Sequence, residues 1–267
     1  MTIGAEGYVS IVELIIYVPA LIAAIIVCSR HGLHRASGWV FTVLLCIIRI
    51  TGAICQLLTY NTPSEGLLQA TIILDSIGLS PLLFATLGVI SRFADWINYR
   101  GTEVFTTKQF RFVQLLITLG LILSVVGGTS ASVSADGQVM VPGTSKAGIS
   151  LYIVAFVGLT IFLVVSSGYR NAVPSQERRS PIAVAIAWPF ILTRLVYSAL
   201  GIFLNNSTFS IIGGEVALHV ALAIVEEFLV VIDYLILGFS LRKLEPEERG
   251  GLANRAWKER RGFLSRS

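Results

Sequence analysis

The sequence predicts an all-α polytopic membrane protein, a bundle of seven transmembrane helices, from three observations. Of the 267 residues, 54% are hydrophobic and 13% are charged, with a mean hydropathy of +0.78, whereas soluble globular domains carry about a quarter charged residues. Seven apolar stretches come close to the roughly 20 residues that a helix needs to cross a bilayer. Basic residues gather in alternate connections, as an odd number of crossings requires.

The seven expected helices follow one another with short connections. Their expected ranges are 9–28, 38–60, 67–91, 110–129, 149–168, 182–204 and 215–238. The first is expected to stay in the protein as a helix, because no Lys or Arg precedes it and the basic residues follow it, unlike in a signal peptide. No linker divides the chain, so we expect residues 1–243 to form one transmembrane domain and residues 244–267 a basic tail.

The positions of the basic residues predict the orientation, since Lys and Arg near membrane ends stay in the cytoplasm. The connections after the first, third and fifth helices and the tail together hold 17 of the 20 Lys and Arg residues. The opposite connections hold only Lys146, and Arg49 and Arg194 lie inside helices. We therefore expect the N-terminus outside and the C-terminus in the cytoplasm, in the endoplasmic reticulum or plasma membrane.

The excess of positive charge does not require a nucleic acid partner. The net charge of +4 follows from the topology and from the tail, which we expect to lie on anionic membrane lipid. The three cysteines all fall inside apolar segments and form neither a disulfide framework nor a metal-binding spacing. We expect no metal, no cofactor and no nucleic acid, and a lipophilic small molecule is a further candidate partner.

An internal echo suggests a parallel repeat of three, one and three helices. The second and sixth helices each carry one central arginine, Arg49 and Arg194, at an offset of 145 residues. The first and fifth helices both end at an arginine, and these arginines are 140 residues apart. The third and seventh helices end in similar sequences that are 150 residues apart. Such a repeat places a site between its halves. The alternative is that the alternating charges produce these coincidences by themselves.

Small residues and prolines predict local features of the bundle. Gly120, Ser124 and Gly128 are spaced by four on the fourth helix and predict a face for close helix packing. Proline interrupts the first, third and sixth helices at Pro19, Pro81 and Pro189, which favours kinks because proline lacks the backbone donor.

Ionisable side chains inside the predicted helices are the strongest functional signal. They are Glu13, Arg49, Asp75, Arg194, Glu226, Glu227 and Asp233. Each costs about 2.5–3.5 kcal/mol at the bilayer centre on an insertion scale, so they should face the bundle interior. Two positive charges oppose five negative ones, so we expect some of the carboxyl groups to hold a proton.

Helical spacing predicts which of these side chains share a face. On the last helix His219, Glu226 and Asp233 lie seven residues apart, and we expect Glu227 to face a neighbouring helix. We expect Arg49 to pair with Asp75 or Glu13, and Arg194 with Glu226. Two interpretations stay open: structural ion pairs that set helix register, or a ligand, substrate or proton site. The candidate catalytic acids are Asp75 and Glu226, and the candidate ligand-binding residues are Glu13, Tyr17, Arg49, Gln56, Arg194, Tyr197 and His219.

Three stretches resemble an uncharacterised family of fungal seven-helix membrane proteins. They are Gly38-Trp39 leading to Arg49 and Gly52, the segment Ile77-Gly78-Leu79-Ser80-Pro81-Leu82-Leu83, and Pro189-Phe190 leading to Arg194 and Tyr197. The resemblance runs over about residues 8 to 243. It implies the seven-helix topology and a fungal source, and it assigns no chemistry.

Three classes of function stay open, of which the sequence favours the first. The first is an enzyme of isoprenoid or meroterpenoid metabolism, similar in architecture to fungal membrane-bound terpene cyclases, in which a protonated carboxylic acid starts cyclisation. Those cyclases carry a buried glutamate on the second helix, where this chain has Arg49. The second is a small-molecule or proton-coupled transporter, favoured by the repeat and the paired arginines. The third is a seven-helix receptor, favoured by topology.

Several chemistries are excluded by missing residues. The last helix contains no lysine for a retinal Schiff base, and no Asp-Asp-x-x-Asp cluster is present to bind magnesium diphosphate. Three histidines are too few for the iron sites of a membrane desaturase.

We predict that tags at the two ends of the chain report opposite sides of the membrane, with the N-terminal tag outside, because the positive charges are so unevenly distributed. Protease digestion of sealed vesicles whose cytoplasmic face points outward checks this. A C-terminal tag that survives digestion in those vesicles would contradict the orientation.

Overall fold

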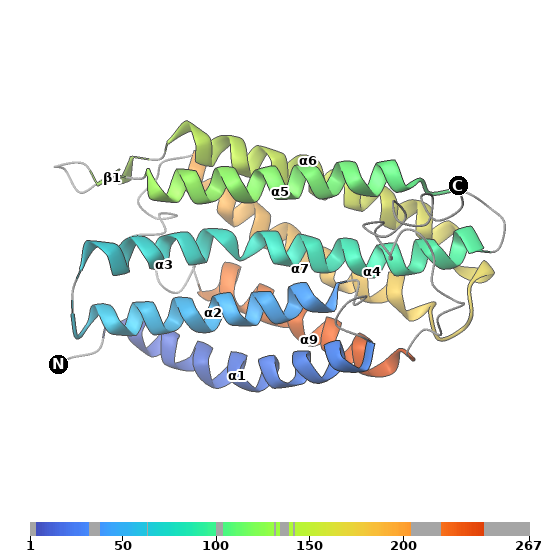
Figure 1. Cartoon of the computed structure of the whole chain (residues 1–267), viewed down its shortest axis with the longest axis horizontal. Helices are drawn as coiled ribbons and strands as arrows, with labels where there is room; N and C mark the ends of the chain where they lie inside the picture. The colour runs from blue at the N-terminus through green and yellow to red at the C-terminus, as the bar shows by residue number, and fades with distance from the viewer. Residues whose placement is uncertain are drawn as a thin grey trace, which may run out of the picture.

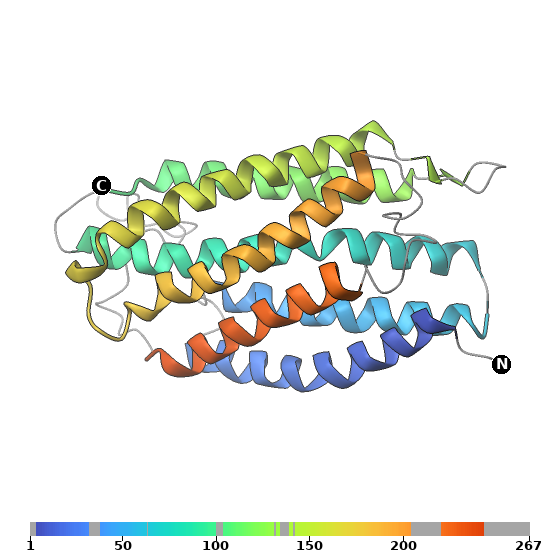
Figure 2. The ribbon, with the colours of Figure 1, turned by 180° about the vertical axis from the view of Figure 1, so that it is seen from behind.

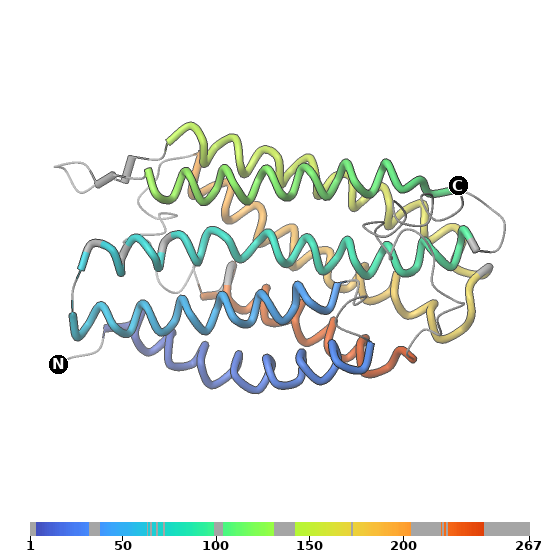
Figure 3. Tube along the Cα trace, in the orientation of Figure 1, coloured from blue at the N-terminus to red at the C-terminus, as the bar shows by residue number. Residues whose placement is uncertain are grey.

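The long helices run back and forth along one axis, with the start of the first and the end of the last at opposite ends of the bundle (Figures 1 and 3). This computed structural model describes residues 4–31, 38–62, 64–99, 104–130, 132–133, 139–140, 142–203 and 220–242. The helices are α1 Ala5–His31, α2 Trp39–Thr59, α3 Glu65–Ile77, α4 Leu79–Tyr99, α5 Thr107–Thr129, α6 Gly143–Gly168, α7 Arg179–Phe203 and α9 Val225–Ser240. Strands β1 Ser132–Val133 and β2 Val139–Met140 form a short antiparallel ladder between α5 and α6.

The predicted fold class is confirmed: apart from the short β1–β2 ladder, the described residues form an all-helical, multi-pass membrane bundle. Helices α1, α2, α5, α6, α7 and the combined α3–α4 span are long and apolar enough to cross a membrane. The expected helix 215–238 is described from Val220 onward, as the π-helical turn Val220–Ile224 followed by the 16 residues of α9. Large apolar side chains such as Ile15, Val164 and Ile236 are more than 60% exposed, which places them against lipid.

Several of the observed helices, among them α1, α5 and α6, are longer than the apolar stretches that predicted them. Helix α6 begins at Gly143 and α5 at Thr107, because polar residues continue a helix beyond the hydrophobic layer. Caps mark some of the starts. The Ser64 hydroxyl accepts a hydrogen bond from the Leu67 amide at 3.2 Å at the start of α3, and Thr106 with Gln109 forms a capping box on α5.

The third pass is broken between α3 and α4, which run end to end in Figure 1. Pro81 has no backbone N–H to donate to the carbonyl of Ile77, four residues earlier. The Ser80 hydroxyl donates to that carbonyl instead, at 3.0 Å, and Gly78 lies at the break. Helices α1 and α7, in contrast, continue through Pro19 and Pro189.

Helix α4 lies at the centre of the bundle. All residues from 78 to 97 are buried, and α4 packs against α2, α5, α6 and α7. Helix α1 lies at the periphery, against α2 and α9. Seen from the front, α7 crosses behind α4, and α9 lies behind α2 (Figures 1 and 2). A helix surrounded in this way must satisfy every polar side chain internally.

The predicted small-residue face on α5 is confirmed. A Cβ atom at Gly120 would lie 2.7 Å from the Tyr152 ring, and one at Gly148 would lie 2.8 Å from the Ser124 hydroxyl. Helices α5 and α6 therefore approach more closely than larger residues would allow. Gly128 faces Ile73 of α3 instead.

Candidate functional site

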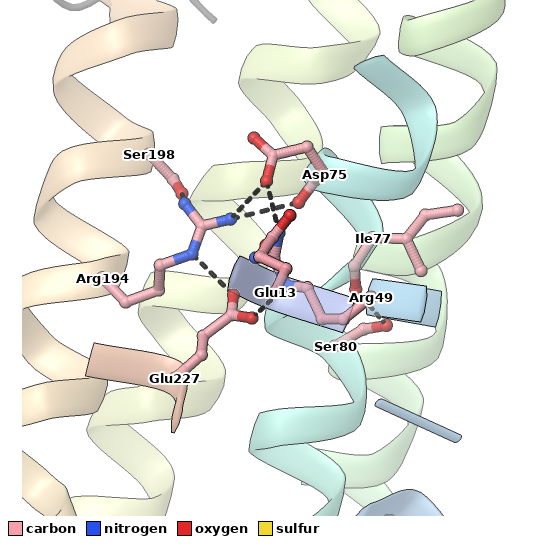
Figure 4. Close-up of polar contacts among 8 residues, drawn as sticks. All are labelled: Glu13, Arg49, Asp75, Ile77, Ser80, Arg194, Ser198 and Glu227. Atoms are coloured by element: carbon pink, nitrogen blue, oxygen red, sulfur yellow. Dashed lines mark hydrogen bonds and ion pairs between the residues drawn. The ribbon is translucent and has the colours of Figure 1, made fainter. Parts of the chain in front are cut away.

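Five charged side chains from five helices meet inside the bundle, and we call them the central cluster (Figure 4). They are Glu13 of α1, Arg49 of α2, Asp75 of α3, Arg194 of α7 and Glu227 of α9. Their side chains are at most 11% exposed. At a rise of 1.5 Å per residue, Glu13 lies about 12 Å from the start of α1, so the cluster is well inside the apolar layer.

Glu227 holds the two arginines together. Its Oε2 accepts a hydrogen bond from Arg49 Nε at 2.6 Å, and its Oε1 accepts one from Arg194 Nε at 2.7 Å. Glu227 is fully buried. Because each carboxylate oxygen takes one charged donor, these hydrogen bonds are of the short, strong kind.

Asp75 lies on the other side of both guanidinium groups. Its Oδ1 is 2.8 Å from Arg49 Nη1 and 3.6 Å from Arg194 Nη2. Arg194 Nη2 also donates to the backbone carbonyl of Asp75 at 3.1 Å, and Arg194 Nη1 donates to the Ser198 hydroxyl at 2.9 Å. The same carbonyl accepts from the Gly78 amide at 3.4 Å at the end of α3, so Arg194 is its second donor.

Glu13 is the least engaged member of the cluster. Its Oε1 lies 3.9 Å from Arg49 Nη1 and has no hydrogen-bond partner among the described residues. Two further buried groups on α1 and α2 also have no such partner in the described part of the chain: the Tyr17 hydroxyl, one turn from Glu13, and Arg49 Nη2. Buried polar groups are normally hydrogen-bonded, so this side of the cluster has unused binding capacity.

The predicted pair of Arg194 and Glu226 is wrong, because the neighbouring carboxylate, Glu227, takes that position. Glu226 is only partly buried, and its Oε2 has no hydrogen-bond partner among the described residues. The buried face of α9 instead contains Glu227, Tyr234 and Gly238. These residues are seven and four residues apart and therefore share a face of the helix. Their spacing in the sequence is the signal that could have identified the buried face.

The other predicted contacts and residues divide into those that join the cluster and those that do not. The expected pairing of Arg49 with Asp75 or Glu13 is confirmed for both acids. Tyr17 and Tyr197 are buried close to the cluster, one turn from Glu13 and Arg194 respectively. Gln56 lies elsewhere, at a partly exposed position where its Nε2 donates to Glu6 at 2.9 Å. His219 lies outside the described residues.

A second charged group lies at the opposite end of α1, and we call Arg92, Glu177 and His31 the end clamp. Arg92 of α4 makes two hydrogen bonds to Glu177, at 3.0 and 2.6 Å, in the turn before α7. It also contacts His31 Nδ1 at 3.3 Å and donates to the carbonyl of Arg242 at 2.9 Å. His31 Nε2 lies 2.9 Å from the Gly238 carbonyl, which can only accept, so Nε2 carries the proton and Nδ1 accepts from Arg92.

Sequence reasoning missed the end clamp. Arg92 directly follows the apolar stretch 67–91, so the charge distribution predicts that it lies in a cytoplasmic connection. Glu177 lies between two helices, so no periodicity marked it. Both are nevertheless buried in the structure, and together they tie the ends of α1, α4, α7 and α9.

Comparison with known families gives a match over nearly the whole chain. A family model described as a domain of unknown function (DUF7702) matches residues 3–244. No curated protein and no solved structure matches the chain. The comparisons therefore assign a family and leave the chemistry of the site to be argued from the residues.

We predict that Arg194→Met and Glu227→Gln each lower the melting temperature in detergent, because each leaves a buried charge without its partner, a loss that typically costs about 3–5 kcal/mol. The double variant should recover much of the loss, since Arg49 and Asp75 still balance each other. A thermal melting series over the four proteins measures this coupling.

Glu226→Gln is the matched control, because it makes the same change one residue away at a partly exposed position. It should change stability by about 0.5 kcal/mol or less. Strictly additive losses for Arg194 and Glu227 would contradict the pairing.

Proposed function

The chain belongs to the DUF7702 family, whose function is unknown, and from the geometry of the central cluster we propose that it is a proton-coupled membrane transporter of small molecules. The observation that carries the proposal is that the cluster is shared between the two halves of the chain. Arg49 and Asp75 come from the first half, and Arg194 and Glu227 from the second. Arg49 bonds Glu227 and Arg194 contacts Asp75, so the ion pairs join the halves.

Helix interruptions beside both acids support the proposal. The break at Gly78 comes three residues after Asp75, and the π-helical turn Val220–Ile224 ends three residues before Glu227. Interrupted helices at corresponding positions of two halves are the sequence pattern typical of substrate sites in secondary transporters.

The spacing of the charges supports a parallel repeat. The two arginines are 145 residues apart and the two acids 152, so each half contributes one arginine and then one acid in the same order. In this proposal the halves move relative to each other about the cluster, which exposes it to each side of the membrane in turn.

The end clamp provides a second connection between the halves, at a different level. Glu13 and His31 are 18 residues apart on α1, which is about 27 Å along the helix axis. Arg92 belongs to the first half and Glu177 to the second. A carrier needs such a contact, because the site must stay closed to one side while it opens to the other.

An enzyme that protonates its substrate is less well supported. The Asp75 carboxylate is already engaged by two arginines, so it is not free to act on a substrate. Glu226, the other candidate acid, lies outside the cluster. A transporter explains both the ion pairs between the halves and the interruptions in the helices. An enzyme explains neither feature.

We predict that purified protein in liposomes loaded with the pH dye pyranine moves protons when the right solute is added. Pools of amines, carboxylates, amino acids and sugars would be screened against protein-free liposomes. The stable double variant Arg194→Met with Glu227→Gln should lose the solute-dependent signal, because the shared ion pairs are gone. If no pool moves protons, or if the double variant transports like the unchanged protein, the proposed function is wrong.

We also predict that Arg92→Met opens the bundle at the clamp end and closes it at the other. Spin labels introduced as unnatural amino acids at exposed Ser29 and Asn171 should move apart in double electron–electron resonance. Labels at exposed Asn61 and Phe203 should move together.

Arg111→Met is the matched control, since Arg111 is an exposed arginine near the start of α5, at the same end of the bundle. It should leave both distances unchanged. Opening at the clamp end without closure at the other would favour a receptor over a carrier.

A further inference from the structure

Resting on the proposed function, we infer that the transported substrate is a small organic cation, and that Glu13 binds either this cation or a proton. The protein would then exchange one for the other across the membrane. The inference comes from the charges of the central cluster, the free carboxyl oxygen of Glu13 and the aromatic side chains next to it.

The central cluster has one negative charge more than it has positive charges when all its carboxyl groups are ionised. Arg49 and Arg194 are matched by Asp75 and Glu227, which bind them through short hydrogen bonds and ion pairs. Glu13 is the third carboxyl group and brings the sum to minus one when it is ionised. A buried net charge is costly unless it is paired, so Glu13 needs a cation that the described residues do not supply.

An anionic substrate fits the cluster less well. Each arginine already contacts both Asp75 and Glu227. A carboxylate ligand would have to displace one of them and would bring the sum to minus two with Glu13 ionised. The arginines therefore hold the cluster together, and the unsatisfied carboxyl group is the binding group.

Glu13 has room in its hydrogen bonding for a new partner. Its Oε1 is 3.9 Å from the nearest arginine nitrogen, against 2.8 Å for the Asp75 carboxylate, and has no hydrogen-bond partner among the described residues. The side chain is 10% exposed. A cation reaching it must therefore be small and must enter after a conformational change, as in a carrier.

Aromatic groups lie one helical turn along the same face. Tyr17 is fully buried, and its hydroxyl also has no hydrogen-bond partner within the described residues. Its ring lies edge-to-face with Phe228 of α9, with the centroids 6.0 Å apart. Aromatic faces attract organic cations, so a carboxylate followed by a tyrosine at i+4 suits an ammonium group.

Exchange of a cation for a proton follows if both bind to the same group, the Glu13 carboxylate. A carboxylate that holds a proton is neutral and has no attraction for a cation, and one that holds a cation resists protonation. The charged groups of the cluster around Glu13 are Arg49 of α2, Asp75 of α3, Arg194 of α7 and Glu227 of α9. Each substrate bound must then release one proton.

The test uses full-length protein in pyranine-loaded liposomes with an acidic interior. Benzyltrimethylammonium added outside should alkalinise the interior at least tenfold faster than in protein-free liposomes. Its permanent charge prevents it from crossing as a neutral base. Benzenesulfonate, an aromatic anion of similar size, and sorbitol should have no effect.

Variants of one carboxyl group isolate Glu13. Glu13→Gln should abolish exchange, and Glu13→Asp should retain it at a reduced rate because it keeps the acid. Glu6→Gln is the matched control, since it makes the same change at an exposed position two turns earlier on α1. It should exchange like the unchanged protein.

A binding measurement in detergent gives an independent readout. Binding of benzyltrimethylammonium should release one proton per cation into weakly buffered solution. Its apparent Kd should rise tenfold for each unit by which the pH is lowered, over the range where Glu13 is protonated. This measurement also tests a variant that is folded in detergent but cannot be reconstituted into liposomes.

The outcomes separate this inference from the proposed function. Proton movement driven by benzenesulfonate or sorbitol but not by the cation would retain a carrier and overturn the assignment of substrate class. Full exchange by Glu13→Gln would overturn the role of Glu13. No proton movement with any solute would refute the transporter itself.

Discussion

The structure depends on one buried carboxylate, Glu227, which binds two arginines from different helices at 2.6 and 2.7 Å. In a bilayer each of these charges would be costly without the others, so α2, α7 and α9 must meet at this level and at no other. The interaction thus determines helix register, which apolar packing leaves poorly specified, since lipid is as apolar as the helix surfaces. Removing any partner leaves the remaining charges in a medium that cannot solvate them.

The broken third pass is part of the same arrangement. Pro81 removes the donor that would have continued the helix through Ile77, and Ser80 satisfies the carbonyl left behind. A Cβ atom at Gly78 would lie 3.1 Å from Arg49 Nη2 and 3.1 Å from Glu227 Oε1. Glycine at the break therefore lets the arginine and the carboxylate approach the backbone, while the end of α3 presents the Asp75 carbonyl to Arg194. A helix defect and a charge cluster stabilise each other.

The end clamp follows the same physical rule at the opposite end of α1. Arg92 lies on α4, which is buried on all sides between residues 78 and 97, so its guanidinium must be fully bonded inside the protein. Glu177, His31 and the carbonyl of Arg242 provide those bonds from three other elements. The bundle is therefore joined by charge at two levels, and packed apolar side chains such as Leu83 and Leu87 fill the space along α4 between them.

The sequence by itself determined the fold class, the seven passes and most of the charged residues that meet. Those features follow from composition and from the energetic cost of intramembrane charge, which a single chain reveals without any neighbour. Arg49, Asp75, Glu13 and Arg194 could be predicted to point inward for that reason. The choice between Glu226 and Glu227 could not, because the π-helical turn before α9 shifts the helical phase, and phase decides which of two adjacent carboxylates faces the arginines. The end clamp also needed the tertiary structure, since Glu177 lies in a turn without periodicity and finds Arg92 only when four helix ends come together.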